Sequence, residues 1–154
     1  MTTITTPRAT RPGLRASCAG LVLTVAATLA PLVDVATADS LTAHVQAAYP
    51  RWSAALVAAD RNAIVTYLAV VGALGLLAWS WAILGIARRK HWSRGLVTTL
   101  FALGLTTAAF DLTFSEGAYA QVIPRPYGLL GMLPVAAGLA AVVLVWHRSP
   151  QPRG

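Results

Sequence analysis

The sequence predicts an all-α integral membrane protein with four transmembrane helices and a short amphipathic helix on the outer membrane surface between the first two. Two observations carry this prediction. The 154 residues are 56% hydrophobic and 11% charged, whereas soluble domains are about 45–50% apolar and about 25% charged. Four apolar runs are each close to the ~20 residues with which a helix crosses a bilayer. A backbone in lipid must satisfy its own polar groups, so these runs are expected to be helical.

The predicted membrane domain covers residues 14–147, between two polar tails. Residues 1–13 are rich in Thr, Pro and Arg and are expected to form a disordered cytoplasmic tail. Residues 148–154 form a second cytoplasmic tail, which is basic. The four predicted spans cover about residues 15–36, 62–87, 95–112 and 127–146.

The segment between the first two spans has a helical pattern. Its larger apolar residues recur at spacings of three and four, which is one face of a helix: Leu41, Val45, Tyr49, Trp52 and Leu56. We interpret residues 40–59 as one or two short amphipathic helices on the outer surface. Pro50 and the polar residues 60–62 favour a break before the second span. The alternative is one long, bent helix over residues 51–87.

The charges alternate along the chain in a way that predicts its orientation. The net charge is +7, and the basic residues cluster in both tails and in the loop at residues 88–94. The five acidic residues lie in the other connections. By the positive-inside rule, both termini and this loop are cytoplasmic, and residues 37–62 and 113–126 face outward. The arginine-rich, lysine-poor composition favours the cytoplasmic (inner) membrane of a bacterium, and the clustering argues against nucleic-acid binding.

Residues 35–40, VATADS, allow a second interpretation of the N-terminal run. Ala36, Thr37 and Ala38 form the A-x-A pattern that a signal peptidase cleaves, after a basic stretch and an apolar core. However, the run over residues 16–36 is longer than the ~7–15 apolar residues of a signal peptide and is long enough to span. We therefore expect an uncleaved first helix. Cleavage would leave three spans and an outward N-terminus.

The outer ends of the spans carry the candidate functional residues. Asp34 and Asp111 end the first and third spans, where the helix dipole disfavours an anion by about 0.3–1 kcal/mol. Each therefore needs a partner, and Arg61 and Arg125 are the cations at this level. The candidate functional site is an outer polar cluster, which Glu116 and Tyr119 would extend, formed by Asp34, Asp60, Arg61, Asp111 and Arg125. The simpler interpretation, which we favour, is a solvated rim with one or two ion pairs.

Small residues inside the spans are expected to let helices approach closely. Gly104 and Ala108 form one small-x-x-x-small pair, and Ala69 and Ala73 form another. Such pairs are frequent in an alanine-rich chain, so they indicate helix packing without identifying the partners.

The sequence contains no recognisable catalytic or metal-binding pattern. The single Cys18 excludes an intramolecular disulfide, and the three histidines lack the spacing of a metal site. A glycine-rich phosphate loop and a G-x-S-x-G motif are also absent. We therefore predict no catalytic residue, metal or cofactor, and lean against an enzyme.

Three function classes follow, in order of preference. The first is a non-enzymatic partner, assembly or sensor protein. The second is a membrane enzyme or binder of an apolar ligand, such as a lipid or quinone, at the outer interface. The third is a small transporter, although the middle of the first span lacks the ionisable residue that proton coupling needs. The expected partner is the lipid bilayer, with another membrane protein or a second copy of the chain as further candidates.

Overall fold

The computed structural model describes residues 11–88, 90 and 92–147, and these residues form five helices. The helices are α1 (Arg11–Ala36), α2 (Ser40–Ala48), α3 (Ala54–Ala87), α4 (Ser93–Thr113) and α5 (Arg125–Trp146). Of these, α1, α3, α4 and α5 are each long and apolar enough to cross a membrane. The all-helical class and the short helix between the first two long ones are therefore confirmed.

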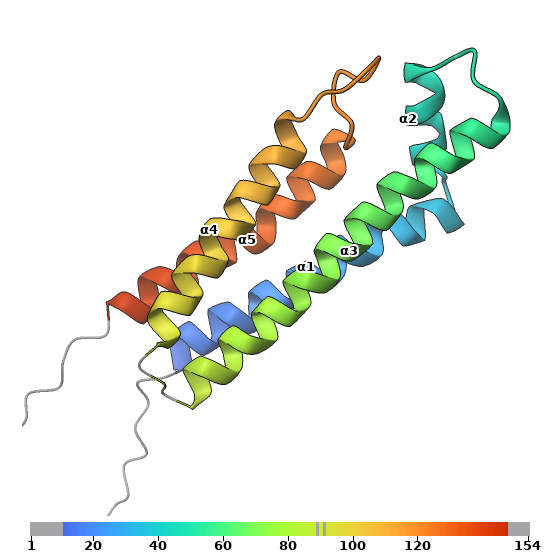
Figure 1. Ribbon diagram of the computed structural model, residues 1–154. Coiled ribbons are helices and arrows are strands. Elements are labelled where there is room, and N and C mark those ends of the chain that lie inside the picture. The colour runs from blue at the N-terminus through green and yellow to red at the C-terminus, as the bar shows by residue number, and fades with distance from the viewer. Residues whose placement is uncertain (1–10, 89, 91, 148–154) are drawn as a thin grey trace, which may run out of the picture.

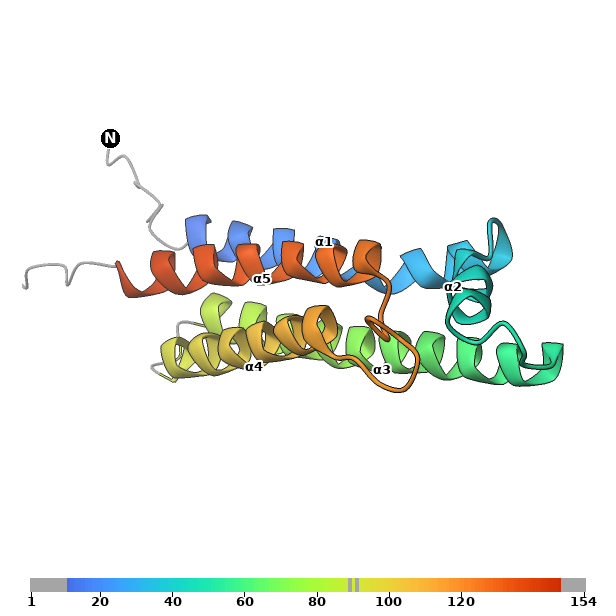
Figure 2. The ribbon, with the colours of Figure 1, turned by 90° about the horizontal axis from the view of Figure 1, so that it is seen from above.

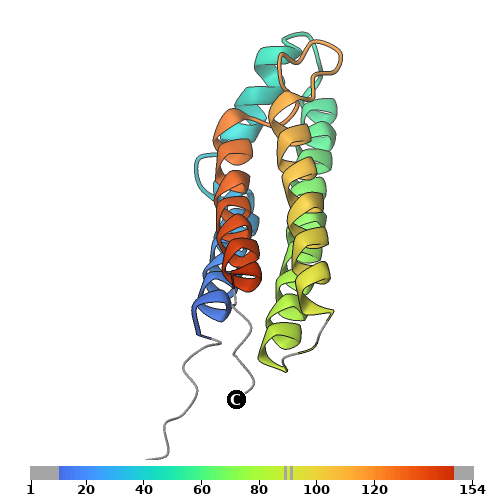
Figure 3. The same cartoon turned by 90° about the vertical axis from the view of Figure 1, so that its left-hand side faces the viewer.

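The four long helices lie side by side in two layers, with α1 and α5 in one layer and α3 and α4 in the other (Figures 1 and 2). α1 packs extensively on both α5 and α3, and α4 packs mainly on α5. By contrast, α3 and α4 contact each other much less. We call the end where α1 begins and α5 ends the basal end, and the end that carries α2 the distal end (Figure 3).

A small core of its own closes the distal end. α2 lies beside the first turns of α3, and the connection between α4 and α5 reaches the same place (Figure 1). The buried side chains of this distal core are Leu41, Val45, Val57, Ile64, Tyr119 and Ile123. A second, basal core joins α3, α4 and α5 at the other end, through Ala82, Ile86, Val97, Ala141 and Val145.

The residues of the predicted amphipathic face are divided among α2, the connection after it and α3. Leu41 and Val45 of α2 are fully buried, whereas Trp52 and Leu56 are exposed. α2 ends at Ala48, shortly before Pro50, because a proline inside a helix removes a hydrogen bond and clashes with the preceding turn. The outer segment therefore forms one short helix, Tyr49 and Trp52 lie in the connection that follows it, and Leu56 belongs to α3.

α3 begins well before residue 62, where the second span was expected to start. Its first helical residue is Ala54, and the Ser53 hydroxyl accepts a hydrogen bond from the Leu56 amide at 3.4 Å. Serine is a favoured residue at this capping position, because its oxygen satisfies an otherwise unpaired amide of the first turn. The long-helix alternative therefore describes this region better than two separate surface helices.

The polar residues 60–62 do not break α3. Asp60 accepts a hydrogen bond from the Tyr119 hydroxyl, and Arg61 forms an ion pair with Asp39. Both partners come from elements that pack on α3 at the distal end. The polar side chains are thus satisfied by tertiary contacts while the backbone stays helical.

The tails predicted from the sequence fall mostly outside the described residues. Residues 1–10 and 148–154 are not described, and residues 11–13 already belong to α1. The described helices therefore extend slightly beyond the predicted membrane domain at its N-terminal side.

Candidate functional site

A cavity of about 540 Å³ lies inside the bundle, between the distal and basal cores. Small-molecule sites typically measure about 300–1,000 Å³. All four long helices line the cavity, mostly with aliphatic, aromatic and glycine residues: Thr24, Ala27, Thr28, Leu68, Val71, Gly72, Leu74, Gly75, Ala78, Trp79, Ala82, Val97, Leu100, Phe101, Leu103, Gly104, Thr107, Ala108, Asp111, Tyr127, Gly131, Pro134, Val135 and Gly138.

The cavity is elongated along the helix axes. Its wall runs from Leu68 to Ala82 on α3 and from Val97 to Asp111 on α4, which is about 20 Å at the helical rise of ~1.5 Å per residue. The basal part of the wall is apolar. Asp111 and Tyr127, the two ionisable residues of the wall, both lie toward the distal end.

The cavity opens sideways between α3 and α4. Most of the lining residues are buried or half-buried, but Leu74 is 61% exposed and Leu103 is 60% exposed. Gly104, next to Leu103, is also exposed. These three residues lie about halfway along the cavity, on α3 and α4, which contact each other much less than α1 contacts α5 or α3. The opening therefore faces the apolar flank of the bundle and not either end.

Glycine residues, which have no side chain, leave part of the cavity open. An added Cβ at Gly104 or at Gly131 would meet no atom within 4 Å. Gly104 therefore does not make the close helix contact expected of its pairing with Ala108. Such a contact occurs between α1 and α3, where a Cβ on Gly72 would overlap Thr28.

Asp111 places a buried carboxyl group in the wall of this cavity. Its side chain is 8% exposed, and the Tyr67 hydroxyl donates a hydrogen bond to Oδ1 at 2.6 Å. This bond joins α3 to α4 near the distal end of the cavity. The second carboxyl oxygen has no hydrogen-bond partner among the described residues, and it is not sealed from its surroundings.

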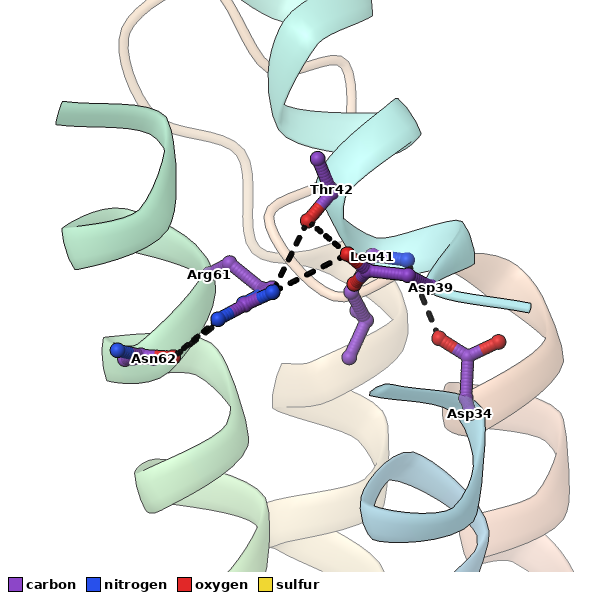
Figure 4. A network of polar contacts seen from close by, with 6 residues as sticks. All are labelled: Asp34, Asp39, Leu41, Thr42, Arg61 and Asn62. Atoms are coloured by element: carbon purple, nitrogen blue, oxygen red, sulfur yellow. Dashed lines mark hydrogen bonds and ion pairs between the residues drawn. The ribbon is translucent and has the colours of Figure 1, made fainter. Parts of the chain in front are cut away.

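Asp34 has a different role, at the junction of α1 and α2. Its Oδ2 accepts a hydrogen bond from the Leu41 amide at 3.2 Å (Figure 4). The hydroxyls of Ser40 and Tyr127 lie near the same carboxylate. A carboxylate is favourable at a helix N-terminus, so the partner that Asp34 needed is the start of α2 and not an arginine.

Arg61 reaches from α3 to the start of α2. It forms an ion pair with Asp39 at 3.1 Å and hydrogen bonds with Thr42 and Asn62 (Figure 4). Asp39 has a left-handed backbone with φ of 47°, a conformation that aspartate tolerates better than most residues. The pair is half-buried, and comparable exposed pairs contribute about 0–1 kcal/mol. Its role is to hold α2 on α3.

Asp60 and Tyr119 form a further contact in the distal core. Burial raises the pKa of Tyr119 well above its usual value, and the hydrogen bond to the Asp60 carboxylate raises it further. The tyrosine ring also stacks on His44, with ring centroids 5.2 Å apart, and meets Tyr49 edge-on. This group of rings anchors the α4–α5 connection on α2.

The five predicted residues all lie toward the distal end, but in separate contacts. Arg125 is exposed and donates to the Gln121 side chain at 3.0 Å, and Glu116 is also exposed. Among the hydrogen bonds and ion pairs of the described residues, none joins two of the five. Only Asp111 of the five lines the cavity. Sequence reasoning missed Tyr67 and Tyr127, since a tyrosine near a span end also fits an interfacial anchor.

Within the described residues, no group of three or more His, Cys, Asp or Glu side chains is placed to hold a metal ion. Comparisons of the chain with protein families, with curated proteins and with solved structures gave no match. The cavity and its wall therefore provide the observations from which a function can be inferred.

Proposed function

We propose that this chain is a multi-pass membrane protein that binds an apolar small molecule in the cavity between its long helices. This proposal is supported mainly by the apolar cavity of about 540 Å³ that opens between α3 and α4. A molecule dissolved in lipid would reach this opening directly, without passing through water.

The outer surface of the bundle supports placement in a membrane. Large apolar side chains along α3 are exposed, among them Val70, Leu77, Trp81 and Leu84. Soluble proteins rarely expose continuous apolar patches of more than a few hundred square ångströms. Lipid contact explains these side chains without a protein partner.

The charge distribution supports an orientation with the basal end in the cytoplasm of a bacterium. Arg15, Arg88, Lys90 and Arg94 all lie at the basal end, whereas the distal elements carry the acidic residues. By the positive-inside rule, both termini would be cytoplasmic, and α2 would lie on the outer face.

Cysteine labelling tests this orientation. In a Cys18→Ala background, a single cysteine in place of Ser115 is expected to react in intact cells with a membrane-impermeant maleimide. A cysteine in place of Lys90 is expected to react only after the cells are opened. The reverse pattern would invert the proposed topology, and labelling of both sites in intact cells would argue against a membrane barrier between them.

The wall of the cavity favours an apolar ligand. Its polar hydroxyls are largely engaged within their own helices: Thr24 and Thr28 donate to backbone carbonyls at 2.8 and 2.7 Å, four residues earlier in α1. Apolar cavities tend to remain dry and to accept apolar molecules. An unfilled cavity also lowers the stability of a folded protein, because the side chains around it lack packing partners. A bound molecule would therefore stabilise the bundle.

This proposal favours the second function class from the sequence, as a binder and not as an enzyme. The ligand site proposed here lies between the long helices, whereas the sequence had suggested a site at the outer interface of the membrane. A partner, assembly or sensor role is compatible with ligand binding and stays a prediction, as does transport.

Filling the cavity tests the proposed function. Gly131→Leu is expected to occupy the space, because even a Cβ there meets nothing within 4 Å. The probe is bromododecane, whose bromine quenches tryptophan fluorescence, added to protein in phosphatidylcholine nanodiscs. Trp79 lines the cavity and serves as the reporter once the four exposed tryptophans, Trp52, Trp81, Trp92 and Trp146, are replaced by phenylalanine.

The expected result is saturable quenching of Trp79 that Gly131→Leu abolishes. The matched control is Gly95→Leu, since Gly95 is equally open but lies outside the cavity. It is expected to bind the probe as the parent protein does. Quenching that rises linearly with the probe and is the same in all three proteins would show that bromine reaches Trp79 only from bulk lipid, and the proposal would be wrong.

A further inference from the structure

We propose that the ligand of this cavity carries a protonated amine at one end, that Asp111 binds this amine, and that the apolar chain extends toward Trp79. This inference rests on the proposed function and specifies the chemistry of its ligand. It names a single-chain amphiphilic amine as the class of molecule that the site recognises.

Asp111 has no cationic partner among the described residues. The residue is 8% exposed, and Tyr67 supplies one neutral hydrogen bond to its carboxyl group. Arg61 and Arg125, the cations expected to balance it, contact Asp39 and Gln121 instead. Buried charges in proteins are almost always paired. A cationic group on the ligand would supply the partner that the described residues do not.

The carboxyl group of Asp111 can also accept a further hydrogen bond. Tyr67 donates to Oδ1 and leaves Oδ2 without a donor among the described residues, in a side chain that lines the cavity. An ammonium group has three donors and no acceptor, so one N–H can bond to Oδ2. Charge-assisted bonds of this kind are shorter and stronger than neutral ones. An anionic head group has no N–H to donate to Oδ2.

The wall of the cavity changes in polarity along its length. Asp111 and Tyr127 both belong to the distal part of the wall, whereas Trp79, Phe101 and Val97 line the basal part. The distance between these ends is about 20 Å by helical rise, which suits one extended alkyl chain. The gradient also fixes the direction of the ligand, with the amine distal and the chain basal.

The position of the opening fits an amphiphile as well. Leu74, Leu103 and Gly104 place it halfway along the cavity, between the polar and the apolar ends. A single-chain molecule entering from lipid can therefore place its head group toward Asp111 and its tail toward the basal core. Neither end of the bundle needs to open.

The test compares head groups in the Trp79 quenching assay, in zwitterionic phosphatidylcholine nanodiscs. The probes are dodecylamine and dodecanol, each with a bromine on the terminal carbon of the chain. We expect the amine to reach half-maximal quenching at a concentration about tenfold or more below that of the alcohol, given the strength of hydrogen bonds to charged groups. Acetylation of the amine removes its charge and is expected to abolish this advantage.

The residue is tested with Asp111→Asn, which keeps the size of the side chain and removes its charge. We expect the amine and the alcohol to bind this variant equally. Glu116→Gln is the matched control, because it removes an exposed acid outside the cavity, and it is expected to keep the preference for the amine. The comparison of probes in the parent protein needs no variant, so poor folding of Asp111→Asn would not leave the inference untested.

The outcomes separate the two proposals. If bromododecane, the alcohol and the amine all quench saturably at the same concentration, the cavity binds ligands and the amine inference is overturned. If the amine preference persists unchanged in Asp111→Asn, its counter-ion is not Asp111, and the inference is again overturned. If no probe quenches saturably, the proposed function itself fails.

Discussion

Gly72→Ala is expected to lower the stability of the bundle by about 1–3 kcal/mol, the range found when a packed core receives an extra methyl group. An added Cβ at Gly72 would lie 2.6 Å from Cγ2 and 2.8 Å from Cβ of Thr28, with Oγ1 closer still. No rotation of the Thr28 side chain relieves the overlap with its Cβ. Moreover, Oγ1 is held by its hydrogen bond to the Thr24 carbonyl. α1 and α3 must therefore move apart.

A thermal unfolding curve in detergent, followed by circular dichroism, measures this effect. Thr28→Ala removes the two nearest atoms and is expected to restore part of the stability in the double variant. Gly104→Ala is the matched control, because its Cβ meets nothing within 4 Å, so this variant is expected to be unchanged or to gain up to about 1 kcal/mol from the better helix propensity of alanine. An unchanged melting curve for Gly72→Ala would mean that the two helices do not approach so closely.

A chain that begins at Asp39, as cleavage after Ala38 would leave it, is expected not to fold. α1 packs on both α5 and α3, and it contributes Thr24, Ala27 and Thr28 to the wall of the cavity. Its loss also removes Asp34, which accepts a hydrogen bond from the first turn of α2. The apolar faces of α3 and α5 that α1 covers would become exposed.

Two measurements check this expectation. Size-exclusion chromatography of the shortened chain is expected to show aggregate and no defined peak, whereas the chain with α1 gives one. Peptide mapping by mass spectrometry of protein from its native membrane is expected to recover peptides from residues 16–36. A native protein that starts at Asp39 and binds bromododecane would contradict both the first-helix interpretation and the cavity as described.

The long helices could be predicted because their causes are local. A run of about 20 apolar residues has few other ways to satisfy its backbone in lipid, and each of the four runs corresponds to a long helix. The start of α3 could not be read in the same way. Asp60 and Arg61 resemble a helix break in the sequence, but Tyr119 and Asp39, distant along the chain, satisfy both side chains within the helix.

For the candidate site, the sequence predicted at which end of the bundle the residues lie, but not which of them contact one another. Asp34 and Asp111 end the first and third predicted spans and were therefore expected at the same end of the bundle, and both lie toward the distal end. Whether two such residues meet depends on the rotation of each helix about its axis. That rotation turns Asp111 toward the cavity and Tyr67, while it leaves Asp34 to the start of α2.

The sequence by itself determined the helical class, the four apolar segments and the distribution of charge between the two ends, because hydrophobicity, run length and charge are properties of each segment alone. Only the tertiary structure decided where the cavity lies. Gly72 and Gly104 are both glycines inside long apolar helices, yet Gly72 packs against Thr28 and Gly104 borders open space. The difference arises because helix packing depends on which faces meet, and this is a property of pairs of segments.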